Sequence, residues 1–293
     1  MNTTTTISLY NTTTTKGEFF DLLSDEVTEL RLYNVQGLDD PEVAAAISRL
    51  KGLKHLYIEN SDIGTADTVL DLNQCTDLEW LSIRTIDLRY LPKIDSCTEL
   101  KTIMISVRSY IPGDHIKDKL EAIGQYTIRN TLADVDWSKL TKLRTLDLCS
   151  NGIEGTIPDS IGTLTSLTTL DLSFNRLTGS VPKTVSRLKN LECIKLSYNK
   201  LSTGLDSIKA MPNLSRIEVQ SNLFTGKIPD SLFRTGSKCK YTNVLLYGNS
   251  FDEQVLPPRL RKGITVHIDS NISVPDDWCT IEEDSHYTSL IKV

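Results

Sequence analysis

The segment LTKLRTLDLCSNGIEGTIPDSIGT (140–163) is followed by LTSLTTLDLSFNRLTGSVPKTVSR (164–187) and by LKNLECIKLSYNKLSTGLDSIKA (188–210), and another copy of the same pattern begins directly afterwards. In the first copy, Leu143, Leu146 and Leu148 precede Asn151, and the same spacing returns in the next two copies. A fixed period of this length predicts a solenoid, in which each repeat forms one coil and stacked coils share a core.

These copies resemble the repeats of the leucine-rich-repeat family. Their tails GTIP, GSVP and GKIP, which start at Gly155, Gly179 and Gly226, resemble the plant-type subclass. The resemblance implies an α/β leucine-rich-repeat solenoid, with a curved parallel β-sheet on the concave face and short helices, 3-10 turns and extended segments on the convex face. It also implies binding of a protein or peptide, with the partner chosen by the exposed positions of the sheet.

The apolar-x-apolar frame of the repeats continues in both directions and predicts about eleven strands. Their central pairs are Leu30/Leu32, Leu56/Ile58, Leu81/Ile83, Ile103/Ile105, Tyr126/Ile128, Leu146/Leu148, Leu170/Leu172, Ile194/Leu196, Ile217/Val219, Val244/Leu246 and Val266/Ile268. The steps between them stay within the usual length of such repeats.

We therefore expect one solenoid domain over residues 17–293, preceded by a low-complexity Thr-rich arm over residues 1–16 that is either flexible or β-prone. Within the domain, the sequence predicts an N-terminal cap helix at 17–26, repeats at 27–274 and a C-terminal cap and tail at 275–293. Asp40-Pro41 and Asp114 are expected to start true helices on the back of two N-terminal coils.

A polar slot follows each strand and divides the chain into two halves. In the last six coils it holds asparagine, whose amide donates and accepts at once and can satisfy the backbone groups of stacked turns. This expected ladder consists of Asn151, Asn175, Asn199, Asn222, Asn249 and Asn271. The N-terminal half lacks these asparagines, so we expect it to be less regular.

Composition limits the partners. The net charge of −6 and pI near 5.3 disfavour nucleic acid and anionic membranes as main partners. Four histidines and the absence of metal, protease or nucleotide motifs give no support for a metal or cofactor. No apolar run reaches membrane-spanning length, so we expect no membrane insertion. We expect a monomer.

The chain has six cysteines, and their positions in the repeats indicate whether they are paired or reduced. Cys75 and Cys97 occupy a slot that leucine fills elsewhere, so we expect small, reduced core residues, although adjacent coils would bring them within bridging range. Cysteine-paired caps are missing and the N-terminus has no secretory h-region, which predicts a cytoplasmic protein. The alternative is secretion by a leaderless or non-standard route.

Side chains between the framework residues form columns on the exposed face of the sheet. Aromatic and arginine residues dominate binding hot spots, and they gather in two clusters here. The N-terminal cluster is Arg31, Tyr33, His55, Tyr57, Glu59, Trp80 and Arg84, and the second is Phe174, Lys195, Tyr198, Arg216, Glu218 and Tyr247. For Phe174 and Tyr198, the competing interpretation is a position that tolerates any side chain.

An enzyme is the third hypothesis. Asp147 and Asp171 occupy equivalent positions of neighbouring repeats, as the two carboxylates of a carbohydrate-active enzyme would. Aspartate is nevertheless a common filler in such repeats, and an open face offers no pocket to raise one pKa. The sequence therefore predicts a non-enzymatic protein-interaction module. The alternative is a secreted or cell-surface recognition protein, similar to receptor ectodomains or enzyme inhibitors, which a glycan on Asn213 would favour.

Overall fold

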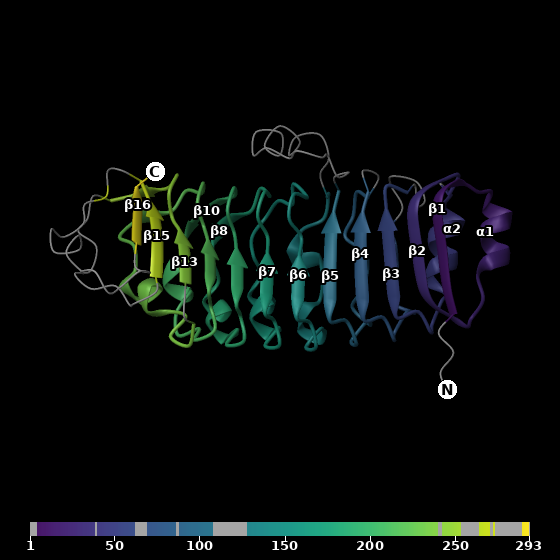
Figure 1. The fold of residues 1–293 in the computed structure, drawn as a ribbon, viewed down its shortest axis with the longest axis horizontal. Coiled ribbons are helices and arrows are strands. Elements are labelled where there is room, and N and C mark those ends of the chain that lie inside the picture. Colours follow the sequence, from purple (N-terminus) through teal and green to yellow (C-terminus); the bar gives the residue numbers. More distant parts are fainter. Residues whose placement is uncertain are drawn as a thin grey trace. The chain divides into compact units, whose positions relative to one another are not determined.

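A computed structural model describes residues 5–38, 40–61, 69–85, 88–107, 128–239, 242–252, 264–269, 272 and 289–292 (Figure 1). It divides into two compact units, residues 1–154 (unit 1) and residues 155–293 (unit 2). Each unit contains a parallel sheet with short helices packed behind its strands. The predicted fold class, a leucine-rich-repeat solenoid, is confirmed.

In unit 1, strands that follow one another in the chain also lie side by side, all parallel (Figure 1). They are β1 (Thr5–Thr13), β2 (Val27–Gln36), β3 (His55–Glu59), β4 (Trp80–Arg84), β5 (Thr102–Ser106) and β6 (Thr145–Asp147). The helices are α1 (Lys16–Leu22) and α2 (Pro41–Ser48), with 3-10 turns η1 (Leu132–Asp134) and η2 (Trp137–Lys139).

The sheet of unit 2 has the same parallel order. Its strands are β7 (Thr169–Asp171), β9 (Cys193–Lys195), β11 (Arg216–Glu218), β13 (Thr242–Leu245), β15 (Ile264–Ile268) and β16 (Ser289–Lys292). Unit 2 also contains two small parallel sheets, formed by segments that follow these strands in the chain. In one, β8 (Thr178–Ser180) pairs with β10 (Lys200–Thr203), and in the other, β12 (Thr225–Gly226) pairs with β14 (Ser250–Phe251).

The back of unit 2 consists of 3-10 turns: η3 (Asp159–Thr163), η4 (Lys183–Arg187), η5 (Leu205–Ser207) and η6 (Asp230–Arg234). Pro158, Pro182 and Pro229 immediately precede η3, η4 and η6. Proline sets φ near the value of a helical first turn but disrupts a longer helix. The proline of each tail therefore keeps the back of its coil short.

Leucine and isoleucine side chains of successive coils fill the interior. Leu170, Ile194 and Ile217 of unit 2 are at most 1% exposed, and Leu146 and its equivalents in unit 1 are equally buried. Full burial of such a side chain stabilises the fold by about 1.5–3 kcal/mol relative to exposure. Because each coil alone cannot bury these residues, stability depends on stacking.

One predicted strand is wrong. The pair Tyr126/Ile128 was expected to lie between β5 and β6, but β5 pairs directly with β6, with Thr102 opposite Thr145, a step of 43 residues. Asn151 closes this long coil, because its Oδ1 accepts from Val107 N at 2.9 Å and its Nδ2 donates to Ile105 O at 2.8 Å. Tyr126 and Thr127 themselves lie outside the described residues.

The N-terminal segment pairs with the sheet of unit 1. The Thr-rich run becomes β1, and α1 follows after a capping box in which Thr15 and Glu18 satisfy each other's backbone N–H groups. Phe19 is fully buried, whereas Leu22 is 45% exposed. Helix α2 begins after its Asp40 cap, as predicted.

Several expectations fall outside the described residues. These are the helix after Asp114, the ladder position Asn271 and the C-terminal cap around Trp278. Strand β16 was not predicted, and its backbone pairs with β15.

Asparagine side chains join successive coils of unit 2. Asn199 Oδ1 accepts from Leu177 N at 2.9 Å, and its Nδ2 donates to Leu172 O at 2.9 Å in the preceding coil. Asn222 and Asn249 bond to their preceding coils in the same way. Asn175 Nδ2 donates to Leu172 O at 3.0 Å. Each ladder amide thus satisfies buried turn groups that water does not reach.

Hydroxyl groups perform this task in unit 1. Ser61 Oγ accepts from Val35 N at 3.0 Å and donates to Glu59 O at 3.0 Å. In the next coil, Thr85 Oγ1 donates to Ser61 O at 3.0 Å.

Cys75 and Cys97 are free thiols in the core, whereas Cys149, Cys193 and Cys239 are partly exposed. Cys97 Sγ donates to Leu72 O at 3.1 Å. Burial raises the pKa of Cys75 to about 11 and that of Cys97 to about 12. Both thiols are therefore protonated and unreactive at neutral pH.

Replacement of Asn199 by alanine should destabilise the protein, because Leu177 N and Leu172 O lose their partner inside the fold. A buried polar group left unpaired costs about 1–3 kcal/mol. Urea unfolding of Asn199→Ala should show a loss of this size or larger. The matched control is Asn190→Ala, which removes an exposed hydrogen bond to Thr165 O and should cost well below 1 kcal/mol. Equal losses in the two variants would contradict the ladder's role.

Iodoacetamide at pH 8 should leave Cys75 and Cys97 unmodified in the folded protein, because their raised pKa values keep them as thiols. Peptide mapping by mass spectrometry should find Cys149 modified, since it is partly exposed. Unfolding in denaturant should make all three sites react. A linked peptide containing both Cys75 and Cys97 under native conditions would contradict their free state.

Candidate functional site

The exposed face of β1 to β4 carries an array of aromatic and charged side chains, which we call the N-terminal patch. It consists of Tyr10, Glu29, Arg31, Tyr33, His55, Tyr57, Glu59, Trp80 and Arg84. Strand pairing puts Arg31 opposite Tyr57, and Glu59 opposite both Tyr33 and Arg84. The predicted cluster is therefore brought together, and Tyr10 and Glu29 extend it.

Ring contacts run across neighbouring strands of the patch. Tyr10 stacks on Tyr33 with centroids 5.0 Å apart and planes 3° apart. The Arg31 guanidinium lies 5.0 Å from the centroid of the Tyr57 ring, and Tyr57 in turn lies 6.1 Å from Trp80. The rings of Tyr10, Tyr33, Tyr57 and Trp80 lie on four successive strands, so the fixed spacing of the sheet sets the spacing of these rings.

Glu29 holds the charged side of the patch in place. Its carboxylate is only 9% exposed and accepts from Arg31 Nε at 2.5 Å, with His55 Nδ1 at 3.9 Å. This bond raises the pKa of Arg31 above its usual value. Burial, together with the negative charge of Glu29, also raises the pKa of Tyr57. Tyr57 is therefore a neutral phenol at physiological pH and can donate a hydrogen bond.

Two groups of the patch are available to a ligand. Arg84 is exposed and forms no ion pair within the described part of the chain. The indole Nε1 of Trp80 is buried without a hydrogen-bond partner among the described residues. An unpaired buried donor is costly, and such groups call for an explanation. An acceptor from a partner, reached after a small rotation of the indole, would remove that cost.

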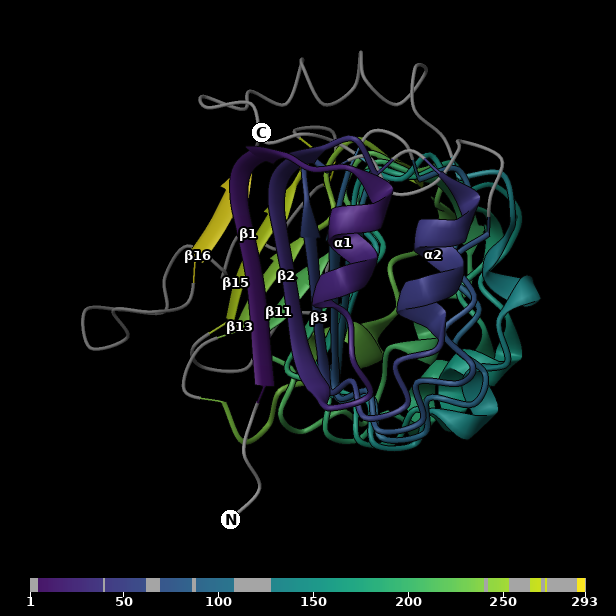
Figure 2. The ribbon, with the colours of Figure 1, turned by 90° about the vertical axis from the view of Figure 1, so that its right-hand side faces the viewer.

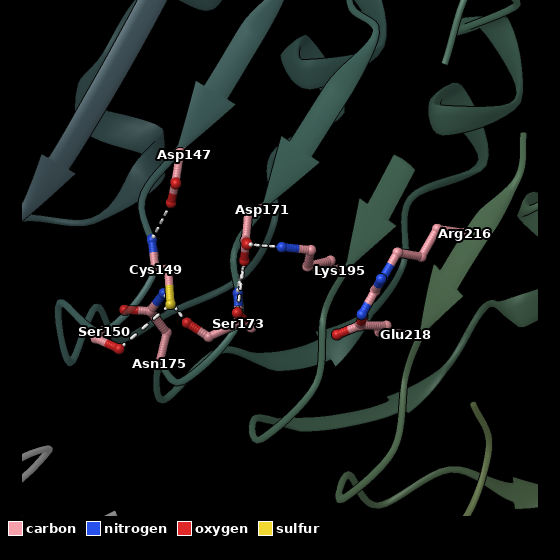
Figure 3. Close-up of polar contacts among 9 residues, drawn as sticks. All are labelled: Asp147, Cys149, Ser150, Asp171, Ser173, Asn175, Lys195, Arg216 and Glu218. Atoms are coloured by element: carbon pink, nitrogen blue, oxygen red, sulfur yellow. Dashed lines mark hydrogen bonds and ion pairs between the residues drawn. The ribbon is translucent and has the colours of Figure 1, made fainter. Parts of the chain in front are cut away.

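The second cluster, here the C-terminal patch, belongs to unit 2, where Phe174 and Glu218 are buried and Tyr198 is partly exposed. Phe174 stacks on Tyr198 with centroids 4.3 Å apart and planes 13° apart. Burial raises the pKa of Tyr247, with smaller contributions from Tyr198 and Glu218. Lys195 pairs with Asp171 at 2.9 Å and Arg216 pairs with Glu218 (Figure 3). Its cations are therefore already neutralised, unlike Arg84.

Phe174 and Tyr198 share a backbone position that explains their placement. Residues before the ladder asparagine have positive φ in successive coils: 55° at Phe174, 56° at Tyr198, 56° at Ser221 and 68° at Gly248. The left-handed region costs an L-residue roughly 1–2 kcal/mol. Backbone bonds to the next coil hold this conformation, since Phe174 N donates to Ser197 O and Tyr198 N to Gln220 O. A slot filled by Phe, Tyr, Ser and Gly accommodates diverse side chains.

Asp147 and Asp171 perform the same local task in their own coils. Each Oδ1 accepts from the backbone N–H two residues later, Cys149 N and Ser173 N respectively, at 3.0 Å (Figure 3). Asp171 also accepts from Ser173 Oγ and binds Lys195, and it is 5% exposed. These bonds end the strand and start the turn. They give the aspartates a structural reason to recur and favour the non-catalytic interpretation.

Other sites are sparse in the described residues. No group of three or more His, Cys, Asp or Glu side chains there is arranged to hold a metal ion. A cavity of about 460 Å³ lies between α1 and α2, lined by Phe20, Leu23, Ala46 and Arg49 among others. None of its lining residues belongs to either patch.

Comparison with known proteins agrees with this architecture. A family model described as leucine rich repeat matches residues 141–201 and 165–224. The ectodomain of the receptor kinase GASSHO1/SCHENGEN3 from Arabidopsis thaliana, solved in complex with CASPARIAN STRIP INTEGRITY FACTOR 2, is 20% identical with a TM-score of 0.68. That match covers 97% of this chain but 33% of the receptor chain. The present chain thus spans about a third of that receptor's length.

Two bacterial structures have the same fold. A leucine-rich-repeat protein of Leptospira interrogans is 21% identical, with a TM-score of 0.63 over 97% of this chain and 70% of its own. The functional domain of InlJ from Listeria monocytogenes is 19% identical, with a TM-score of 0.65 over 98% and 53%. A search of curated protein sequences finds no match. The family model identifies residues 141–224 as leucine-rich repeats, and the described residues have the fold of a leucine-rich-repeat solenoid. Among the described residues, no helix has the length and apolar character needed to cross a membrane.

A double-mutant cycle on Asp171→Ala and Lys195→Ala should reveal a structural coupling, because the pair is close and Asp171 is buried. Hydrogen bonds to charged groups contribute roughly 1.5–3 kcal/mol. Denaturant unfolding of the four proteins should give a coupling near the lower end of this range, since Lys195 is partly exposed. The same cycle on the more exposed pair Glu79 and Lys101 should give at most about 1 kcal/mol. Coupling in the second pair that exceeds the first would contradict this assignment.

Proposed function

We propose that this protein is a non-enzymatic interaction module that binds an extended peptide, or an extended segment of a protein, across the N-terminal patch. The observation that carries the proposal is the set of aromatic rings on β1 to β4, in which Tyr10 stacks on Tyr33 and Tyr57 contacts both Arg31 and Trp80. Arg84 borders these rings and has no ion pair among the described residues. Rigid aromatic area beside an unpaired cation is the usual composition of a binding hot spot.

The patch offers a partner both area and direction. The Tyr57 hydroxyl and Trp80 Nε1 supply donors, and the exposed guanidinium of Arg84, which has no ion pair in the described part of the chain, attracts a carboxylate. A segment lying across the strands therefore presents carbonyl groups to the rings and an acidic group to Arg84. The C-terminal patch is the second candidate surface, but its Lys195 and Arg216 already have carboxylate partners.

Proteins of the same fold support a peptide ligand. Besides the GASSHO1/SCHENGEN3 complex, the plant peptide hormone receptor RGFR1 was solved in complex with RGF2, with a TM-score of 0.53 and 21% identity. The fold alone is common to these proteins and this chain, so the ligand class enters here as a proposal.

The compartment has two candidates. Free Cys75 and Cys97 suit a cytoplasmic protein, as the sequence predicts. The ectodomain structure among the similar folds favours the alternative, a secreted or cell-surface recognition protein. Binding through the N-terminal patch is compatible with either compartment, because the patch contains no cysteine whose redox state would differ between them. Catalysis by Asp147 and Asp171 is disfavoured because both carboxylates serve in turns.

Selection of linear peptides from a displayed random library against the intact protein tests the proposal. Peptides that bind the natural protein should lose at least about 30-fold in affinity for the Tyr57→Ala/Trp80→Ala variant, since two hot-spot side chains contribute about 2 kcal/mol or more. Titration of fluorescent peptides provides the measurement. Arg84→Ala should weaken mainly those peptides that carry an acidic residue.

The matched control is Phe174→Ala/Tyr198→Ala, which removes the stacked rings of the C-terminal patch instead. It should leave these affinities unchanged, and circular dichroism should show that both double variants remain folded. If the control weakens binding and the Tyr57/Trp80 variant does not, the functional surface is the C-terminal patch.

A further inference from the structure

The outer edge of β1 is an open end of the sheet of unit 1. Strand β1 pairs with β2 alone, over Thr5 to Thr13, and Figure 2 shows β1 and α1 in front at this end of the unit. Every second residue of an edge strand directs its N–H and C=O outward, which makes the edge a template for another strand. Nothing in the described part of unit 1 occupies this position.

The edge carries neither charge nor proline, two of the features with which proteins usually block strand addition, although its pairing with β2 is irregular between Thr5 and Thr6 and Asn11 has a φ of 48°. The nine residues of β1, TTISLYNTT, include no charged residue and no proline, and five are β-branched. Ile7 and Leu9 remain partly exposed, and Tyr10 is 53% exposed. By contrast, the edge strand β16 of unit 2 has four residues and ends in Lys292. Short length and lysine both protect an edge, and β1 has neither.

Three exposed acidic residues lie in the coil that joins β1 to β2. Asp21, Asp25 and Glu26 are exposed in the same coil and have no ion pair within the described residues. The one cation of the coil, Lys16, is bound to Asp40 and Glu42, each at 2.9 Å. Two copies meeting through this edge would bring like charges together, whereas a cationic strand would be attracted.

We propose that the edge of β1 binds an extended, lysine- or arginine-rich segment of a partner protein by strand addition. The segment's backbone pairs with the outward N–H and C=O groups of β1, and its cations lie near Asp21, Asp25 and Glu26. One further cation reaches the exposed face of Tyr10, the outermost ring of the stack with Tyr33. This surface differs from the N-terminal patch, because backbone groups rather than side chains provide its main contacts.

A ten-residue peptide that alternates threonine and lysine is the probe, added to the full-length protein. Amide hydrogen exchange read by mass spectrometry should slow by at least about tenfold at outward amides of residues 5–13 when the peptide is bound. The same peptide with N-methyl groups on alternate residues keeps its charge but cannot pair, and it should give no protection. A threonine–glutamate peptide should not bind.

Charge variants test the acidic surroundings. Asp21→Lys/Glu26→Lys should weaken the lysine peptide at least about tenfold, and Asp21→Lys also suits the last turn of α1. Glu192→Lys, an exposed change in unit 2, should have no effect. Tyr57→Ala/Trp80→Ala should also leave this binding intact, which keeps the test independent of the proposed function.

Three results would overturn the inference. Equal binding of the N-methylated peptide would mean adsorption by charge alone. Binding without slower exchange in residues 5–13 would move the contact elsewhere. Slower exchange that appears on raising the protein concentration without peptide, together with a doubled mass in light scattering, would make a second copy the occupant.

Discussion

The fold depends on satisfying the backbone of each turn where the chain leaves the sheet. A solenoid coil turns inside a stack of other coils, so its N–H and C=O groups are out of reach of water. In unit 2 one asparagine per coil meets the demand, as Asn199 does for Leu177 N and Leu172 O. Leucines fill the core, but unpaired turn groups would cancel much of what their burial contributes. This explains why the polar slot recurs as regularly as the leucines.

Much of the architecture could be predicted because the repeat couples apolar and polar positions. Ten of the predicted strand frames match strands of the two sheets. The failure at Tyr126/Ile128 shows that a short apolar-x-apolar pattern is weak without its asparagine. Strand β1 could not be derived from periodicity, because its threonines alternate with few apolar residues. The small β8–β10 and β12–β14 sheets were also missed, since their pairing depends on contacts between turns.

The sequence predicted which side chains of the candidate site lie on the exposed face of the sheet. It did not predict which of these side chains contact one another. Alternation along a strand put Arg31, Tyr57 and Trp80 on the exposed face, because side chains two residues apart share a side. Glu29 was overlooked because nothing in the sequence shows that its carboxylate binds Arg31. Tyr10 was overlooked because its segment was assigned to an arm. The first gap concerns a side-chain contact within β2, and the second concerns the pairing of β1 with β2.

The 43-residue step between β5 and β6 has a consequence for how such a chain can change over time. Asn151 bonds Val107 and Ile105 across this step, so the flanking strands keep their register whatever the length of chain between them. Additional sequence can therefore be acquired at this point without disturbing the stacking on either side. An insertion at this step would leave the strands on either side, and the side chains that they expose, in place.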